Sequence, residues 1–271
     1  MIYHYTDLNA ATSIANNAQM WLTDYRFLND KEEFKQGFEV LLEALESYQD
    51  NSGKYNPEFF YTLSRAIEFI RDDNFSNFEG NNIFVSSFSK TPDLLSQWRS
   101  YGMYCLELDA DFFRDEGVSV LECIYLHDRR EALDKANKII CNEFMPVLFD
   151  TWKENRPYLI DMVLSSLLEI HALSFKHAAF ADEDEVRFVL SCAPDDEKIK
   201  FRVKGQLLIP YVSFDFDPEL LKTIIVGPVD NQELAYESLS MFARKVKRKV
   251  QESNIEYDLV IEKSEIPFRS I

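Results

Sequence analysis

The chain contains 271 residues, 46% of them hydrophobic, and its 22 Phe and 13 Tyr residues are sufficient for a large core. Its formal net charge of −18 opposes tight non-specific binding to nucleic acid, which depends on phosphate neutralisation by Lys and Arg. With only 7 Gly and 9 Pro, the chain is neither linker-rich nor of low complexity, so we expect a single domain over residues 1–271.

The N-terminal sequence "MIYHYTDLNAA" lacks the positively charged region and the apolar region of a signal peptide. No stretch approaches the roughly 18 apolar residues that a membrane span needs. The four cysteines are widely spaced, lie in apolar contexts and form no Cys-x-x-Cys pair: Cys105, Cys123, Cys141 and Cys192. We therefore expect a cytoplasmic protein with buried thiols and no membrane partner.

The first part of the chain opens with a strand and then a helix. Residues 2–6, "IYHYT", alternate aromatic and polar side chains and predict the strand, after which Asp7 is placed to cap the helix. Helical periodicity follows over 31–48 and over 57–71. The segment "NIFVSSFS" (82–89) has the pattern of the next strand.

The segment "FLNDKEEF" contains residues typical of a helix N-terminus, at the start of the helix predicted over 31–48. Asp30 is placed to cap it, and Glu33, three residues later, completes a capping box. For Asn29, Asp30 and Glu33 we therefore favour a structural role over contact with a ligand.

The middle of the chain is predicted to be largely helical. Asp93 is expected to begin a short helix in "DLLSQW", which leads into a strand over 103–109. After a further strand over 118–126, two long apolar helices follow, the second over 157–177. We expect these two helices to form an α-helical insertion that spans about 128–178.

The last third returns to strands. The alternation of Val186, Phe188 and Leu190 predicts a strand, and a strand pair is predicted around "VKGQLLIPYV". The chain is then expected to continue with a strand at "TIIVG", a helix over 231–252 and a last strand at "YDLVIE". The basic run "ARKVKRKV" within that helix is typical of a solvated face. Strands and helices alternate without a steady βαβ rhythm, which favours the α+β class.

Several familiar chemistries lack their sequence signatures. No Gly-x-Gly-x-x-Gly, phosphate-binding loop or Gly-x-Ser-x-Gly motif is present. The four histidines include no pair four residues apart and no nearby cysteine partner: His4, His127, His171 and His177. We therefore expect no metal cofactor.

Polar and aromatic side chains at strand ends are the remaining candidates for function. Glu185 follows Asp182, Glu183 and Asp184 and directly precedes the apolar run of a strand, where a solvated carboxylate is the simpler interpretation. Trp98 and Tyr101 lie three residues apart, and hence on one face of the short helix, so we predict that both line a cleft; placement of both in the core is the alternative.

Five pieces of the sequence, taken in order, resemble a bacterial family known as domain of unknown function 2971. They are "YHYT", "FLNDKEEF", "SSFSKTPDLLSQWRSYG", "KHAAFADEDEVRFV" and "IEKSEIPFR", and they cover nearly the whole length. The layout is also similar to that of the DNA-targeting ADP-ribosyltransferase toxins. This second resemblance implies an ADP-ribosyltransferase-like fold in which two sheets form a cleft, with NAD as the substrate.

The resemblance also implies roles for particular residues. Glu185 matches the catalytic glutamate, and Glu183-x-Glu185 resembles the Glu-x-Glu of some branches. The residues implied to surround NAD are His4, Tyr5, Thr6, Ser87, Ser89, Trp98 and Tyr101. Arg26 is the one counterpart of the arginine-rich NAD-binding loop of the DNA-targeting toxins, which places a nucleic-acid acceptor in doubt.

The chemistry of NAD explains why a carboxylate is needed at a strand end. Cleavage of the nicotinamide–ribose bond passes through an oxocarbenium-like state, which a carboxylate such as Glu185 stabilises as charge develops. Glu183, expected on the same strand face, would orient or deprotonate an acceptor, either protein or nucleic acid. The alternatives are an NAD glycohydrolase or nucleoside N-glycosidase, and a non-catalytic nucleotide- or protein-binding module of a toxin or phage-defence system.

Overall fold

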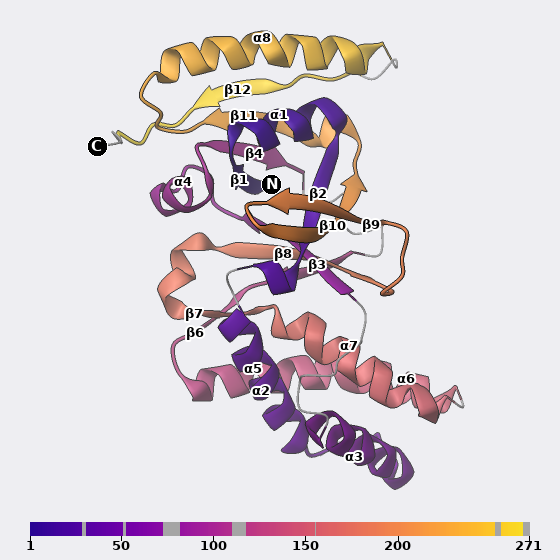
Figure 1. The fold of residues 1–271 in the computed structure, drawn as a ribbon. Helices are drawn as coiled ribbons and strands as arrows, with labels where there is room; N and C mark the ends of the chain where they lie inside the picture. The colour runs from indigo at the N-terminus through magenta and orange to yellow at the C-terminus, as the bar shows by residue number, and fades with distance from the viewer. Residues whose placement is uncertain are drawn as a thin grey trace.

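The computed structural model describes residues 1–28, 31–50, 53–72, 82–109, 118–154, 156–252 and 256–267. It has the predicted mixed α+β architecture, with one large sheet between helices (Figure 1). The capping residues Asn29 and Asp30 lie outside the described residues, as does the side chain of Glu33.

The large sheet follows the order β12–β11–β4–β1–β3–β2–β10–β9, with β8 on β3 and β5 on β8. Its strands are β1 (Ile2–Thr6), β2 (Gln19–Asp24), β3 (Asn82–Ser89), β4 (Tyr104–Leu108), β5 (Ser119–Glu122), β8 (Glu185–Cys192), β9 (Ile199–Lys204), β10 (Leu207–Asp215), β11 (Leu221–Val226) and β12 (Val260–Lys263). Two short parallel strands, β6 (Ile124–Leu126) and β7 (Phe175–His177), form a separate ribbon.

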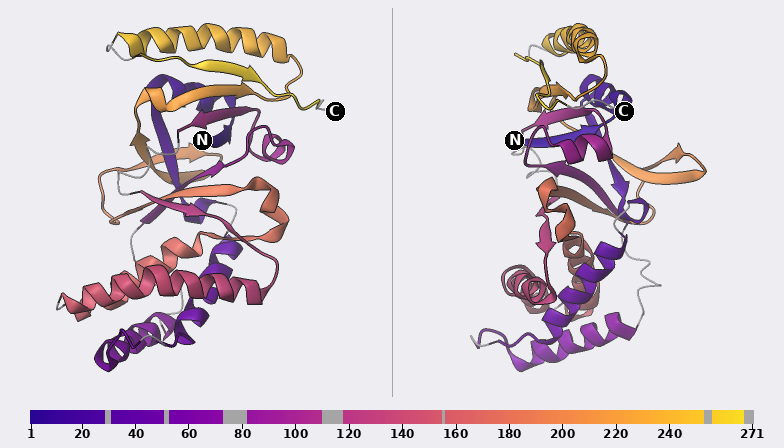
Figure 2. Two further views of the ribbon diagram at one scale, coloured as in Figure 1. Left: turned by 180° about the vertical axis from the view of Figure 1, so that it is seen from behind. Right: turned by 90° about the vertical axis from the view of Figure 1, so that its left-hand side faces the viewer.

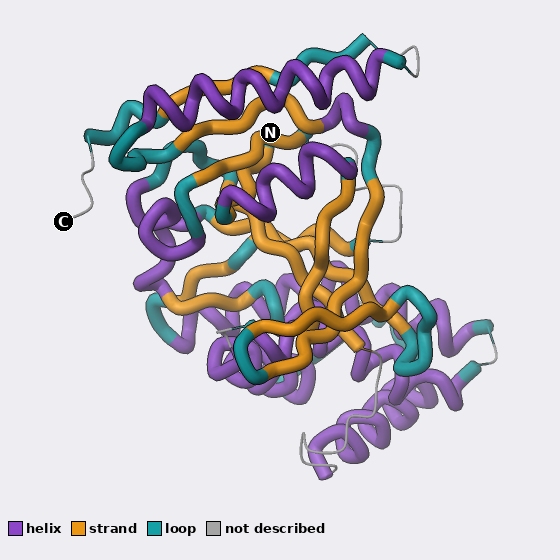
Figure 3. Tube along the Cα trace, turned by 45° about the horizontal axis from the view of Figure 1, so that its top comes forward, coloured by secondary structure: helices purple, strands orange, loops and turns teal. Residues whose placement is uncertain are grey.

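Helices cover the sheet on two sides, as Figure 3 shows in purple. One side carries α1 (Leu8–Asn17) and α8 (Gln232–Gln251), whose apolar faces pack on β4, β8 and β11. The other side carries a helical layer made of α2 (Lys31–Glu46), α3 (Pro57–Asp72), α5 (Arg129–Ile139), α6 (Met145–Lys153) and α7 (Ile160–Ala172). A single π-helical turn, Ile140–Phe144, joins α5 to α6. The sheet thus separates two apolar cores.

Strand β3 is the point at which the sheet divides. One edge of β3 pairs with β8 over its full length, from Asn82↔Cys192 to Ser89↔Glu185. On the other edge, β1 is registered only through Tyr3↔Ser89, and β2 joins further along, at Val85 and Phe84. Between these two partners, the described strands leave the edge of β3 from Ser86 to Phe88 without a registered pair, so β1 and β2 form a fork there.

Most of the predicted elements are present, and the errors have local causes. Strand β2 was not predicted, because its six residues alternate weakly. The helix predicted over 157–177 ends at Ala172, because the chain then extends into β7. The strand predicted over 118–126 is interrupted at Cys123, where its partner changes from β8 to β7.

Smaller details also differ from the expectations. Asp7 does cap α1, accepting from the Ala10 N–H at 2.9 Å. Asp93, which has a φ of 55°, does not cap α4 (Leu95–Tyr101); its carboxylate accepts from the Trp98 indole instead. Cys141 is exposed, contrary to the prediction of buried thiols. The basic run of α8 presents Val246 to the core and most of its charges to solvent, as predicted.

Candidate functional site

A cavity of about 770 Å³ lies at the fork beside β3. Segments that are far apart in the sequence form its walls: β1, α1, β2, β3, α4, the start of β8 and the end of β9. Eight of the ten predicted site residues line it, namely His4, Tyr5, Thr6, Ser87, Ser89, Tyr101, Glu183 and Glu185. The fold therefore brings most of the predicted residues to one place.

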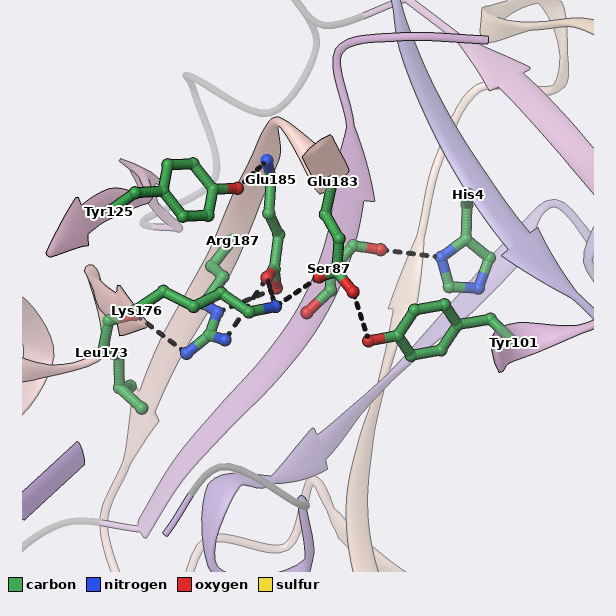
Figure 4. Close-up of polar contacts among 9 residues, drawn as sticks. All are labelled: His4, Ser87, Tyr101, Tyr125, Leu173, Lys176, Glu183, Glu185 and Arg187. Atoms are coloured by element: carbon green, nitrogen blue, oxygen red, sulfur yellow. Dashed lines mark hydrogen bonds and ion pairs between the residues drawn. The ribbon is translucent and has the colours of Figure 1, made fainter. Parts of the chain in front are cut away.

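Four buried charged side chains form a cluster at one wall of this cavity: Lys176, Glu183, Glu185 and Arg187. Figure 4 shows the Lys176 ammonium between the two carboxylates, where it donates to one oxygen of each. Arg187 donates from Nε to Glu185 Oε1 at 2.8 Å and from Nη2 to Glu185 Oε2 at 3.3 Å. Arg187 also donates to the carbonyl of Leu173 at 3.0 Å. Two cations thus accompany two carboxylates, and both oxygens of Glu185 accept from cations.

The cluster holds Glu185 in its ionised form. Burial raises the pKa of the Glu185 carboxyl, but the charges of Arg187 and Lys176 and their hydrogen bonds outweigh burial and lower this pKa to about 2. Burial likewise lowers the pKa of Lys176, and the two carboxylates raise it well above its usual range. Since Glu185 is 6% exposed, the interpretation of a solvated carboxylate at a strand end is wrong.

The backbone at Asp184 explains how Glu183 and Glu185 reach the same lysine. Glu183 ends the 3-10 helix Ala178–Glu183, and Asp184 has a φ of 41°, in the left-handed region. Glu183 therefore does not lie on the strand face of Glu185, contrary to the prediction. The left-handed residue separates the end of the 3-10 helix from the start of β8, and both carboxylates bind Lys176.

Tyr101 is held at the cavity by a close contact between α4 and β1. Its hydroxyl donates to Glu183 Oε1 at 3.5 Å, and its ring is 48% exposed. Gly102 follows with a φ of 135°, and a Cβ atom there would lie 2.3 Å from the carbonyl oxygen of Thr6. Glycine is required at this position on both grounds. The contact fixes the end of α4 beside the end of β1.

His4 fills part of the fork between β1 and β3. Its Nδ1 lies 3.0 Å from the carbonyl oxygen of Ser87, which only accepts, so Nδ1 carries the proton and Nε2 is left as an acceptor. Burial lowers the pKa of His4, and the bond to Ser87 opposes this effect. The neutral imidazole is thus the stable form, and its Nε2 is an acceptor at a residue that lines the cavity.

Two predicted site residues lie away from the cavity. Trp98 is 1% exposed and packs edge-on against Tyr5 in the core, with its ring centroid 4.7 Å away, so the predicted aromatic wall is correct for Tyr101 but not for Trp98. Arg26 binds the buried carboxylate of Asp24, at 2.6 Å from Nη2, and the side-chain oxygen of Asn82. Both residues stabilise neighbouring elements.

Tyr5 and Ser89 line the cavity and also organise the loop after β3. The Tyr5 hydroxyl accepts from the Leu94 N–H at 3.0 Å and donates to the carbonyl of Thr91 at 3.3 Å. Ser89 Oγ accepts from the Thr91 N–H at 3.0 Å. These bonds direct the chain from β3 into α4, and so position Tyr101.

The cations of the site, Arg187 and Lys176, are not among the predicted site residues. An arginine between Val186 and Phe188 in an otherwise apolar strand is nevertheless a signal of a buried partner of opposite charge. A second missed group, Trp21 of β2 and Arg202 of β9, lines another wall of the cavity. Nothing in their sequence context places them in one cavity with His4, because β2 and β9 come close only through their shared neighbour β10.

No group of three or more His, Cys, Asp or Glu residues in the described ranges is arranged to hold a metal ion. Within the same ranges, no helix has both the length and the apolar character that crossing a membrane requires. Comparison with known proteins found no family model, no curated protein and no solved structure that matches this chain.

Proposed function

We propose that the protein is an ADP-ribosyltransferase-like enzyme that cleaves the nicotinamide–ribose bond of NAD in the cavity beside β3. The observation that carries this proposal is the convergence of the predicted residues: His4, Ser87, Tyr101 and Glu183 come from four separate segments and line one cavity. A volume of about 770 Å³ is within the range of sites for ligands of this size.

The strand order supports the proposal. The path β5–β8–β3–β1–β4–β11 sets the strand of Glu185 beside that of Ser87 and Ser89, and the latter beside that of His4. The described strands form one large sheet rather than two, and the fork at β3 divides this path into two parts with the cavity beside it. We interpret these two parts as the counterpart of the two-sheet cleft that the resemblance implies. The strands that carry Glu185, Ser87 and His4 are thus neighbours in the sheet.

The geometry favours a division of labour between the two glutamates. Both oxygens of Glu185 accept from Arg187 or Lys176, whereas Glu183 shares the ammonium and faces the Tyr101 hydroxyl at 3.5 Å. We assign contact with the ribose to Glu183. Glu185 acts through Lys176, which it holds in place beside Glu183, and is a positioning residue.

The proposed step breaks the bond between the ribose C1′ and the nicotinamide nitrogen. The bonding electron pair moves to the nitrogen and neutralises the positive charge of the pyridinium ring, while C1′ takes on oxocarbenium character. A carboxylate near the ribose hydroxyls stabilises that charge only as it develops. A nucleophile, which is either a group of an acceptor molecule or water, then forms the new bond to C1′ and loses its proton.

The experiment is to incubate the purified chain with NAD and to measure free nicotinamide. Glu183→Gln is expected to lower release by about a hundredfold or more, because it removes the charge and keeps the shape. Asp182→Asn is the matched control, since Asp182 is the exposed neighbouring acid, and its rate should equal that of the unaltered chain. Equal rates for Glu183→Gln and the unaltered chain would exclude this assignment. Labelled NAD with cell extract then distinguishes transfer from hydrolysis.

One observation favours a second candidate, a non-catalytic nucleotide-binding module. The charges of the cluster compensate one another within the protein, as in a structural ion-pair network. This candidate predicts that NAD binds and that nicotinamide is not released from the unaltered chain.

A further inference from the structure

The hairpin of β9 and β10 contributes a second wall to the cavity. These strands pair from Ile199↔Val212 to Lys204↔Leu207 and turn at Gly205, which has a φ of 60°. Strand β10 also pairs with β2, which places the hairpin next to the fork. The right-hand view of Figure 2 shows it projecting from the body of the molecule.

Aromatic and cationic side chains share one face of this hairpin and β2. The Trp21 ring lies 4.5 Å from the ring of Tyr211, and the Arg202 guanidinium lies 5.4 Å above Trp21 and 5.9 Å from Tyr211. The Trp21 side chain is 41% exposed and lines the cavity together with Arg202 and Lys204. An exposed indole with a stacked guanidinium is a surface on which a nucleobase stacks well.

Arg202 has donor capacity that the described part of the protein does not use. Its Nη2 donates to Thr23 Oγ1 at 2.9 Å, whereas its Nε is buried and has no hydrogen-bond partner there. A buried, unsatisfied donor of a charged group is costly unless a ligand pairs with it. Phosphate oxygens suit it, since guanidinium forms strong bonds with phosphate.

The two walls of the cavity differ in the charged groups that line them. Glu183 and Glu185 line one wall, where they are paired with Lys176 and Arg187, and Arg202 and Lys204 lie at the other wall, in a chain whose net charge is −18. In the sheet, β8 and β9 are separated by β3, β2 and β10. An anionic pyrophosphate matches the wall of Arg202 and Lys204, and the carboxylate oxygens of the other wall suit the hydroxyl groups of a ribose.

We propose that Trp21, Arg202 and Lys204 form a nucleotide subsite, in which the purine base stacks on Trp21 and the phosphates bind Arg202 and Lys204. This inference rests on the proposed function for the identity of the nucleotide, an adenine nucleotide. The β9–β10 hairpin thereby holds the half of NAD that does not react, and the carboxylate wall holds the nicotinamide riboside.

The test is calorimetric titration of the full chain with ADP, which contains no nicotinamide–ribose bond. Arg202→Gln is expected to weaken ADP binding at least tenfold, and Lys204→Gln, an exposed change that leaves folding intact, several-fold. Trp21→Ala should weaken ADP binding more than the binding of inorganic pyrophosphate, which carries no base. The matched control is Arg244→Gln on α8, at an exposed position that does not line the cavity; it should bind as the unaltered chain does.

The outcomes separate this inference from the proposed function. The subsite would be overturned if the unaltered chain did not bind ADP. It would also be overturned if Arg202→Gln and Lys204→Gln bound ADP as tightly as the unaltered chain. Either result would stand even if nicotinamide is released. Binding that depends on Arg202 without any nicotinamide release would support the subsite and contradict the enzyme. Thermal unfolding of each variant shows whether a loss of binding reflects a loss of structure; if Arg202→Gln does not fold, the result with Lys204→Gln decides.

Discussion

Two buried carboxylates of this protein, one on β8 and one on α7, have pKa values shifted in opposite directions. Glu185 of β8 is 6% exposed and its pKa falls to about 2; Glu169 of α7 is 7% exposed and burial raises its pKa to about 7. Glu185 accepts from Arg187 and Lys176, whereas Glu169 forms no ion pair with any described residue, and only the more distant charge of Arg26 opposes its burial. Burial is thus similar for both carboxylates, and their cationic partners decide whether the pKa is lowered or raised.

The comparison shows how the candidate site maintains its charge. A carboxylate that was merely buried near the cavity would be only partly ionised near neutral pH, as the pKa of Glu169 illustrates, and would present less charge to a ligand. Arg187 and Lys176 prevent this at Glu185. They also make the site depend on four side chains at once, since loss of any one leaves an uncompensated buried charge.

The largest expected effect is that of Glu185→Gln. This change leaves Arg187 and Lys176 with one carboxylate fewer, so it should lower the free energy of unfolding by about 3–5 kcal/mol. Urea denaturation monitored by circular dichroism measures it, and an unchanged midpoint would show that the cluster is not coupled to folding.

The decrease in the free energy of unfolding at acid pH should depend on Glu185 as well. Because the pKa of Glu185 is about 2 in the folded protein and 4.5 as its reference value, its contribution is fully present above pH 4.5 and is lost as the pH falls toward 2. The loss amounts to about 3 kcal/mol. Unfolding free energies between pH 5 and pH 2, with Glu185→Gln as the comparison, test this; parallel curves for the two proteins would contradict it.

Glu169→Gln should raise the free energy of unfolding, whereas Glu185→Gln should lower it, and its effect should appear in a different pH range. The folded pKa of Glu169 is about 7 against a reference of 4.5, so its contribution is present below pH 4.5 and is lost as the pH rises through 7. A neutral amide avoids this loss and should stabilise the protein at pH 8 by about 2–3 kcal/mol, with little effect at pH 4. Thermal unfolding at the two pH values measures the difference, and equal effects at both would refute the assignment.

The smallest effect is expected where a carboxylate is paired but exposed. Glu122 of β5 pairs with Lys90 at 2.9 Å, and its side chain is 74% exposed. Glu122→Gln should change the unfolding free energy by less than about 1 kcal/mol, because solvent screens the pair. The same urea titration applies. A loss as large as that of Glu185→Gln would mean that burial does not distinguish the two carboxylates.

Much of the fold was predictable because its strands and helices have clear periodicity. Strands β1 and β3 match the predicted ranges, since alternation in "IYHYT" and "NIFVSSFS" reflects their pairing with neighbours. Strand β2, "QMWLTD", was missed because its short pattern is consistent with a loop, and it becomes a strand by pairing with β10. Local pattern cannot reveal a partner that lies almost two hundred residues away.

The candidate site was predictable as a set of residues but not as an arrangement. Glu183 and Glu185 were singled out, and both reach the cavity, but by a route that the sequence does not indicate, through the left-handed backbone of Asp184. Lys176 was assigned to a helix, where it would have no reason to face Glu185. The pairing of β7 with β6 decides its direction.

The fork is the place where backbone pairing within the sheet is sparsest. The ladders on either side are long, with five pairs between β1 and β4 and eight between β3 and β8, whereas β1 and β3 are joined by the registered pair Tyr3↔Ser89 and the hydrogen bond between His4 and Ser87. A ligand that contacts His4 and Glu183 at once would add a connection between the two ladders where the protein has few of its own. Its binding should therefore stabilise the fork more than either ladder.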